Sequence, residues 1–214
     1  MPKSLQTGLF LDCGGHVGES ILHFKKTTLY ADTQWDIHTF EPCNELADKM
    51  LCRDDGDVTV HKKAVWINDG EVDFYLTDGR SDYYGVEDVP WGSSTVMKEK
   101  TSGNVNPDNM QSVPCMDLSA FIKENSANHD LVILKMDIEG AEYDVLEYLL
   151  ETGAMNAINI LMVEYHYRKV KVSFWRHFKL KRRLKKLGIT IIEERKGHVS
   201  GDWFHTLSDM TEEA

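Results

Sequence analysis

Several features that would assign a protein to a class at once are missing from this chain of 214 residues. No apolar run approaches the ~20 residues that span a bilayer, and the N-terminus has no apolar region typical of a signal peptide. The four cysteines form no C-x-x-C pair and no cluster with histidine, which argues against zinc and against a disulfide framework. We therefore expect a cytoplasmic protein without a membrane span.

The chain also has fewer basic residues than acidic ones. The formal net charge is -11, which argues against nonspecific binding to nucleic acid. The hydrophobic and charged fractions are those of a folded globular protein. The length suits one α/β domain with a full core, so we expect residues 1–214 to form a single domain.

The most informative stretch is GLFLDCGGHVGES, which spans Gly8 to Ser20. A short apolar run ends in Asp12, three glycines follow, and apolar residues then recur at helical spacing. This order predicts a buried strand, a tight glycine turn and the N-terminus of a helix. Glycine allows a sharp turn and close approach of a ligand, and the helix start offers free N–H groups. A structural turn without a ligand is the alternative.

Two phosphate-binding motifs are absent from this turn. A dinucleotide fingerprint that starts at Gly14 needs glycines where the chain has His16 and Glu19, and no phosphate-loop string occurs. The motif present is D-x-G-x-x-x-G, which begins with Asp12 at the strand end. A carboxylate there repels phosphate and suits a cation. S-adenosylmethionine (SAM), which carries a sulfonium and an ammonium but no phosphate, fits this pattern.

Later strands end in polar residues as well. Trp35–Pro42 is a predicted second strand, and its Glu41 follows Gly18 by 23 residues, near the spacing at which α/β nucleotide folds place an acid on the ribose. Val58–Trp66 is a predicted third strand, where Ala64 leaves room for an adenine. We expect Glu71–Leu76 to form a hairpin with it. A surface acid at a strand end is the alternative for Glu41.

The second half continues the alternation of strands and helices. Leu131–Asp137 is a predicted central parallel strand, Asn159–His166 a fifth strand, and Ile189–Glu194 with Asp202–Ser208 an antiparallel pair. We therefore expect a mostly parallel, doubly wound sheet with an antiparallel hairpin at its C-terminal edge. The polar residues that end predicted strands would meet at one edge of it; they are Asp12, Glu41, Lys63, Asp137 and His166.

Two segments have open interpretations. Residues 78–112 show no clear period and are rich in Gly, Ser, Asp and Asn, so we expect a long loop or lid whose aromatic residues Tyr83, Tyr84 and Trp91 line a substrate mouth. A mobile surface loop is the alternative. Residues 168–186 contain many basic residues and no acid, which suits an anionic substrate or a lipid surface, or a solvated helix face.

Leu134–Leu146, LKMDIEGAEYDVL, resembles the hallmark segment of the FkbM family of SAM-dependent methyltransferases. FLDCGGHVGES is similar to the first motif of that family, FEP to its second, and MVEYH to its segment at the end of the fifth strand. Ala64-Val65 and Gly92-Ser93-Ser94 resemble two further segments more weakly. The family more often has Ala and Asn where this chain has Gly15 and His16.

The resemblance implies a Rossmann-like domain that methylates hydroxyl groups on sugars or secondary metabolites. Its acceptor would be a small molecule or a glycan, and S-adenosylhomocysteine (SAH) its product. Asp12, Gly14 and Gly18 would hold the methionine end of SAM, Glu41 the ribose and Ala64 the adenine. The complete set of expected SAM-binding residues is Asp12, Gly14, Gly15, His16, Val17, Gly18, Glu41, Pro42, Ala64, Val65, Ser94 and Asp137.

The acceptor hydroxyl must lose a proton, so we expect a base near the methyl group. The candidates are His166, Asp137 and Glu139, of which histidine has the best-suited pKa. Asp137 has SAM binding as an alternative role, and Glu139 has bracing of the following helix. No metal-ligand string occurs, and we expect no metal, although three carboxylates near one strand end leave that option open. A nicotinamide-dependent oxidoreductase and a noncatalytic binding module are the competing functions.

Overall fold

A six-stranded sheet forms the centre of the computed structural model, which describes residues 6–100, 102–193 and 203–207. The strand order is β11-β10-β9-β1-β2-β3, and all neighbours pair in parallel. The strands of this sheet are β1 (Gln6–Cys13), β2 (Thr33–Phe40), β3 (Val58–His61), β9 (Leu131–Met136), β10 (Ile160–Val163) and β11 (Thr190–Glu193). The predicted strands around Asp12, Glu41 and Asp137 are thereby confirmed.

The order in which successive strands are added to this sheet changes direction beside β1. It first runs outward from β1 through β2 to β3, and later returns to place β9 on the other side of β1. In open α/β sheets, ligands bind at the carboxyl ends of the strands at this switch point. The crevice therefore belongs at the ends of β1 and β9.

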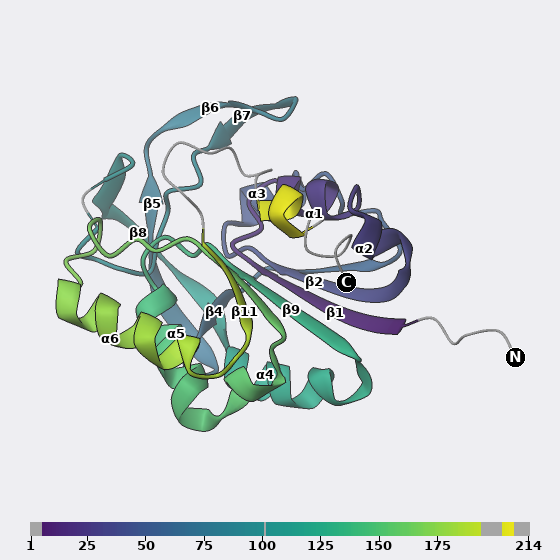
Figure 1. The fold of residues 1–214 in the computed structure, drawn as a ribbon. Helices are drawn as coiled ribbons and strands as arrows, with labels where there is room; N and C mark the ends of the chain where they lie inside the picture. Colours follow the sequence, from purple (N-terminus) through teal and green to yellow (C-terminus); the bar gives the residue numbers. More distant parts are fainter. Residues whose placement is uncertain (1–5, 101, 194–202, 208–214) are drawn as a thin grey trace, which may run out of the picture.

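Helices cover both faces of the sheet (Figure 1). On β1, the alternation of side chains sends Phe10 to one face, where it stacks on Phe24 of α1 with ring centroids 4.2 Å apart. Leu9 and Leu11 point to the other face and join the core formed with α4, α5 and α6. The helices are α1 (Glu19–Phe24), α2 (Thr28–Ala31), α3 (Asn44–Asp48), α4 (Leu118–Asn125), α5 (Glu142–Thr152) and α6 (Phe174–Lys185), with the 3-10 turns η1 (Ser126–Asn128) and η2 (Ala154–Ala157).

A second sheet corrects the prediction for Val58–Trp66. This stretch forms two strands, because only β3 joins the main sheet, whereas β4 (Ala64–Trp66) pairs in parallel with β8 (Val105–Asp117). The expected hairpin with the next strand is not formed either. β8 lies between β4 and β5 (Gly70–Thr77), in the order β4-β8-β5.

Residues 78–112 contain regular structure where a loop is predicted. Strands β6 (Arg80–Tyr83) and β7 (Val86–Pro90) form an antiparallel hairpin, and the segment ends in the first part of β8. Figure 1 shows this hairpin standing above the main sheet. β8 owes its extended form to antiparallel pairing with β5, a distant contact that leaves no period in the local sequence.

The predicted antiparallel hairpin at the C-terminal edge is wrong. β11 pairs in parallel with β10, and residues 203–207 are helical. Trp203, Phe204 and Leu207 are all buried in the same core as Phe10. Their spacing of one and four residues matches a helix turn better than a strand. Asp202 and Ser208, the ends of the predicted strand, lie outside the described residues.

Local features of the sequence fix the ends of two helices. The Asp117 side chain caps α4 by accepting from the Ala120 N–H at 3.0 Å, and Gly153 ends α5 in the left-handed conformation. The four cysteines are buried and free. Within the described part of the chain, every helix is too short or too polar to cross a membrane.

Candidate functional site

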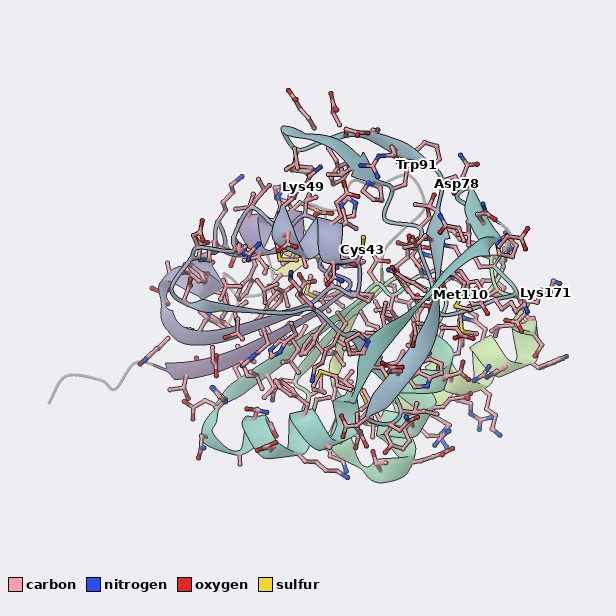
Figure 2. The ribbon with its side chains drawn as sticks, turned by 180° about the vertical axis from the view of Figure 1, so that it is seen from behind. Cys43, Lys49, Asp78, Trp91, Met110 and Lys171 are labelled. Carbon is pink, nitrogen blue, oxygen red and sulfur yellow. The ribbon has the colours of Figure 1, made fainter. Side chains whose placement is uncertain are left out.

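A cavity of about 540 Å³ opens at the carboxyl ends of β1, β2 and β9. The second sheet and the β6–β7 hairpin complete its walls. Figure 2, seen from behind, shows Trp91, one of the lining residues, where the hairpin returns toward the second sheet. Many of the predicted site residues line the cavity: Gly14, His16, Glu41, Pro42, Ala64, Val65, Ser94, Asp137 and Glu139.

The glycine turn after β1 is held against the end of β9. Gly14 has a φ of +85°, and a Cβ at this position would lie 1.9 Å from the carbonyl oxygen of Asp137. Only glycine fits such a contact. The N–H groups of Gly14 and Gly15 donate to the carbonyl of Phe40 at 3.0 and 3.1 Å, so the turn is also fixed to the end of β2.

Asp12 has a different role from the one predicted. It is fully buried, and Lys135 lies 3.0 Å from its carboxylate, to which Ser20 and Thr39 also donate. The cation that Asp12 faces is therefore a lysine of the neighbouring strand β9. The Lys135 ammonium also donates to the carbonyl of Gly14 at 2.8 Å and lines the cavity, so it presents positive charge where Asp12 was expected to present negative charge.

Glu41 is positioned by backbone donors at the end of β2. Its two carboxylate oxygens accept from the N–H groups of His16 at 3.0 Å and Cys43 at 2.8 Å. Burial raises the pKa of Glu41 to about 7, and those two N–H groups oppose the shift. The carboxylate lines the cavity with its orientation fixed and with lone pairs left for a ligand.

His16 connects the glycine turn to the hairpin. Its Nε2 lies 3.1 Å from the carbonyl oxygen of Pro90, and its ring contacts Tyr83 edge-on with centroids 4.8 Å apart. Ser94 is held on the far wall, where its hydroxyl accepts from the N–H of Thr77 at 3.1 Å. The hairpin therefore forms one wall of the cavity.

Some predicted residues lie behind the cavity wall. Gly15, Val17 and Gly18 shape the turn but do not line the cavity. Asp12 and His166 also lie outside the lining. Lys63, predicted to end a strand at the cleft, is exposed and lies outside the lining. It falls between β3 and β4, at the point where the chain leaves one sheet for the other.

A cluster of acidic residues surrounds His166 at the ends of β9 and β10. Its Nε2 lies 3.9 Å from Asp137 Oδ1, 3.2 Å from Glu139 Oε2 and 3.1 Å from Glu164 Oε1. The three carboxylates line the cavity, while His166 is buried behind them. Glu139 has a left-handed backbone with a φ of 55°.

The expectation of a neutral His166 that acts as a base is not supported by this environment. Burial lowers the pKa of His166, but the charge and hydrogen bond of Glu142, with help from Glu164 and Glu139, outweigh it and raise the pKa to about 11. The imidazole therefore keeps its proton at neutral pH. In the absence of a bound metal ion, it is a charged partner of the carboxylates, together with Lys100 and Lys169.

Glu142 is a site residue that sequence reasoning missed. Its Oε1 accepts from the N–H groups of Ile138 and Gly140, both at 3.1 Å, and lies 2.9 Å from His166 Nδ1. It thus braces the turn after β9, a role that the sequence had suggested for Glu139. Lys135 was also missed, although one lysine in the otherwise apolar Leu131–Met136 is a signal of a buried ion pair.

The segment that contains this cavity matches a known family. Residues 12–188 fit the family model described as methyltransferase FkbM domain. The interval spans more than half of the chain and includes the glycine turn, Glu41 and the acidic cluster. None of the curated proteins matches the chain.

Proposed function

Because the chain belongs to the FkbM family of methyltransferases and is therefore a methyltransferase enzyme, we propose that it methylates a hydroxyl group of a small molecule or glycan with SAM as the methyl donor. The family generally depends on SAM. The observation that carries the proposal is one cavity with a fixed carboxylate, Glu41, at one end and the acidic cluster of Asp137, Glu139 and Glu164 at the other.

The cavity residues suit SAM. The volume of about 540 Å³ falls within the range of small-molecule pockets. Glu41 has lone pairs for the two ribose hydroxyls, and apolar Ala64 and Val65 offer a flat surface for adenine. The Lys135 ammonium suits the carboxylate of the methionine end, and Asp137 suits its amino group.

When bound, SAM supplies a methyl group that its sulfonium activates for displacement. The protein aligns an acceptor oxygen with that carbon, and such positioning accounts for much of the acceleration. In such a transfer the acceptor oxygen would take the methyl group, and the electron pair of the broken carbon–sulfur bond would stay on sulfur. The hydroxyl proton would pass to a carboxylate of the cavity wall, and Asp137, Glu139 and Glu164 line that wall.

Binding measurements separate this proposal from the competing functions. We expect calorimetry to show that SAH binds far more tightly than NAD or ATP, since the turn lacks both phosphate fingerprints. Tighter binding of NAD than of SAH would contradict the proposal. A noncatalytic module would bind SAH yet fail to methylate any member of a library of sugar and metabolite alcohols.

A further inference from the structure

His166 has one ring nitrogen whose environment the methyl transfer does not explain. Its Nε2 is buried and has no hydrogen-bond partner, although three carboxylates lie within 3.9 Å of it. A proton on Nε2 would therefore be surrounded by three acceptors, none of which is well aligned with it. This arrangement is unusual for a buried polar atom and is typical of a nitrogen aimed at a shared central ligand.

Two separations in the cluster are those of atoms around one metal ion. Ligand atoms about 2.1 Å from an ion lie roughly 3 to 4.2 Å from one another. Nε2 is 3.2 Å from Glu139 Oε2 and 3.9 Å from Asp137 Oδ1. One ligand atom from each of these three residues lies within 4.8 Å of the others. A third carboxylate is equally close, because Glu164 Oε1 lies 3.1 Å from His166 Nε2.

The opposite side of the imidazole matches a metal-bound histidine. Nδ1 lies 2.9 Å from Glu142 Oε1, which the N–H groups of Ile138 and Gly140 hold in place. Metal-bound histidines almost always donate their second ring nitrogen to a carboxylate or carbonyl, which fixes the tautomer and leaves the first nitrogen free to bind. This contact is independent of the acidic cluster around Nε2.

The charges of the cluster also favour a cation. Four carboxylates, those of Asp137, Glu139, Glu142 and Glu164, meet here. Two lysines approach from outside: Lys100 contacts Glu139 Oε2, and Lys169 lies 3.6 Å from Glu164 Oε1. With a neutral imidazole, the four carboxylates and two lysines leave two negative charges, which a divalent ion would neutralise. Lys100 does not block the site, because a carboxylate has lone pairs for more than one partner.

We propose that Asp137, Glu139 and His166 bind a divalent first-row metal ion, with Glu142 as the carboxylate that orients the histidine. One imidazole among carboxylates suits Mn²⁺ or a similar ion better than Ca²⁺, which takes oxygen ligands. The inference deepens the proposed function, on which it rests for its role, because the ion would hold the acceptor hydroxyl beside the methyl group. It replaces the expectation of no metal.

Manganese uptake tests the site without any assay of activity. The whole protein is treated with EDTA, dialysed and titrated with Mn²⁺ while electron paramagnetic resonance follows the free ion. We expect one equivalent to bind. Glu139→Gln should weaken binding by more than about tenfold, since loss of an outer-shell partner alone costs 10–100-fold. Glu124→Gln, an exposed residue of α4, serves as the matched control and should bind as the parent does.

The outcomes are separable from those of the methyltransferase proposal. SAH binding is measured on the metal-free protein, so SAH binding without Mn²⁺ uptake overturns the metal site and leaves the methyltransferase proposal intact. Equal Mn²⁺ binding by the parent, Glu139→Gln and Glu124→Gln also overturns it. If thermal melting shows that Glu139→Gln is unfolded, His166→Gln takes its place with the same expected loss.

Discussion

The two ends of the cavity hold carboxylates in opposite ways. At the end of β2, backbone N–H groups of His16 and Cys43 fix Glu41, so its geometry depends on the main chain. At the ends of β9 and β10, Asp137, Glu139 and Glu164 meet around His166, and the side chains of His166, Lys100 and Lys169 bring positive charge to them. The first arrangement suits recognition of an invariant ligand, whereas the second suits a place where charge changes during a reaction. Substitutions should therefore affect affinity at one end and rate at the other.

The largest effect is expected at the acidic cluster. Asp137→Asn keeps the size of the side chain but removes a carboxylate beside the proposed position of methyl transfer. Turnover should fall by about 10²–10⁴, the usual contribution of a positioned acid or base, with a smaller loss of SAH affinity. Asp130→Asn changes the same residue type at the opposite end of β9, where the carboxylate accepts from the Thr7 N–H. It should retain the parental rate; parental turnover of Asp137→Asn would remove the contrast between the two ends.

At the other end, Glu41→Ala should act on affinity. It removes hydrogen bonds from the ribose hydroxyls to a charged group, which costs on the order of 1.5–3 kcal/mol, or roughly 10–150-fold in the dissociation constant of SAH. Calorimetry measures this loss. Glu45→Ala, four residues further on α3 and outside the cavity lining, is the control. If Glu41→Ala binds SAH as the parent does, the ribose lies elsewhere.

The same carboxylate predicts a pH dependence. The pKa of Glu41 is raised to about 7 by burial, and the ribose hydroxyls donate to its charged form. SAH affinity should therefore rise with pH up to about 7 and level off above it, by roughly tenfold between pH 6 and pH 8. Glu41→Gln carries no titrating group and should flatten that part of the profile. An unchanged slope in this variant would assign the titration to another residue.

The smallest effect is expected at the hairpin wall between the two ends. Trp91→Ala removes an aromatic surface from the cavity, and an aromatic contact contributes about 0.5–1.5 kcal/mol. The KM for the acceptor should rise roughly 2–12-fold while SAH affinity stays constant. Tyr84→Ala, at the hairpin tip outside the lining, should change neither quantity. An equal loss of SAH affinity in Trp91→Ala would show that the hairpin covers the cofactor.

Local patterns were sufficient for the central elements and for half of the site. The apolar run before Asp12 and the run that ends at Asp137 predicted β1 and β9, because strands buried on both faces need apolar residues at nearly every position. Glu41 was found from its distance to the glycine turn. The apolar runs are local patterns of a few residues, and the distance from the glycine turn to Glu41 is set by the length of one helix and one strand.

The remaining features depend on contacts between distant parts of the chain. β8 includes Pro107 and Pro114 and several polar residues, and only its pairing with β5 makes it a strand. The partner of Asp12 is 123 positions away, at Lys135. The protonation of His166 depends on Glu164 nearby in the sequence and on Glu139 and Glu142 from the turn after β9, more than 20 positions away.

The backbone of Glu139 has a consequence for how this fold changes over time. Its φ of 55° lies in the region that glycine and asparagine occupy easily and that costs other residues roughly 1–2 kcal/mol. Backbone conformation alone would favour glycine at this position, so glutamate is kept against a local conformational cost. Its carboxylate also pairs with the buried Lys100, so a change to glycine would relieve the backbone but leave that ammonium without its carboxylate partner. We therefore expect a substitution of Glu139 to be accompanied by a change at Lys100.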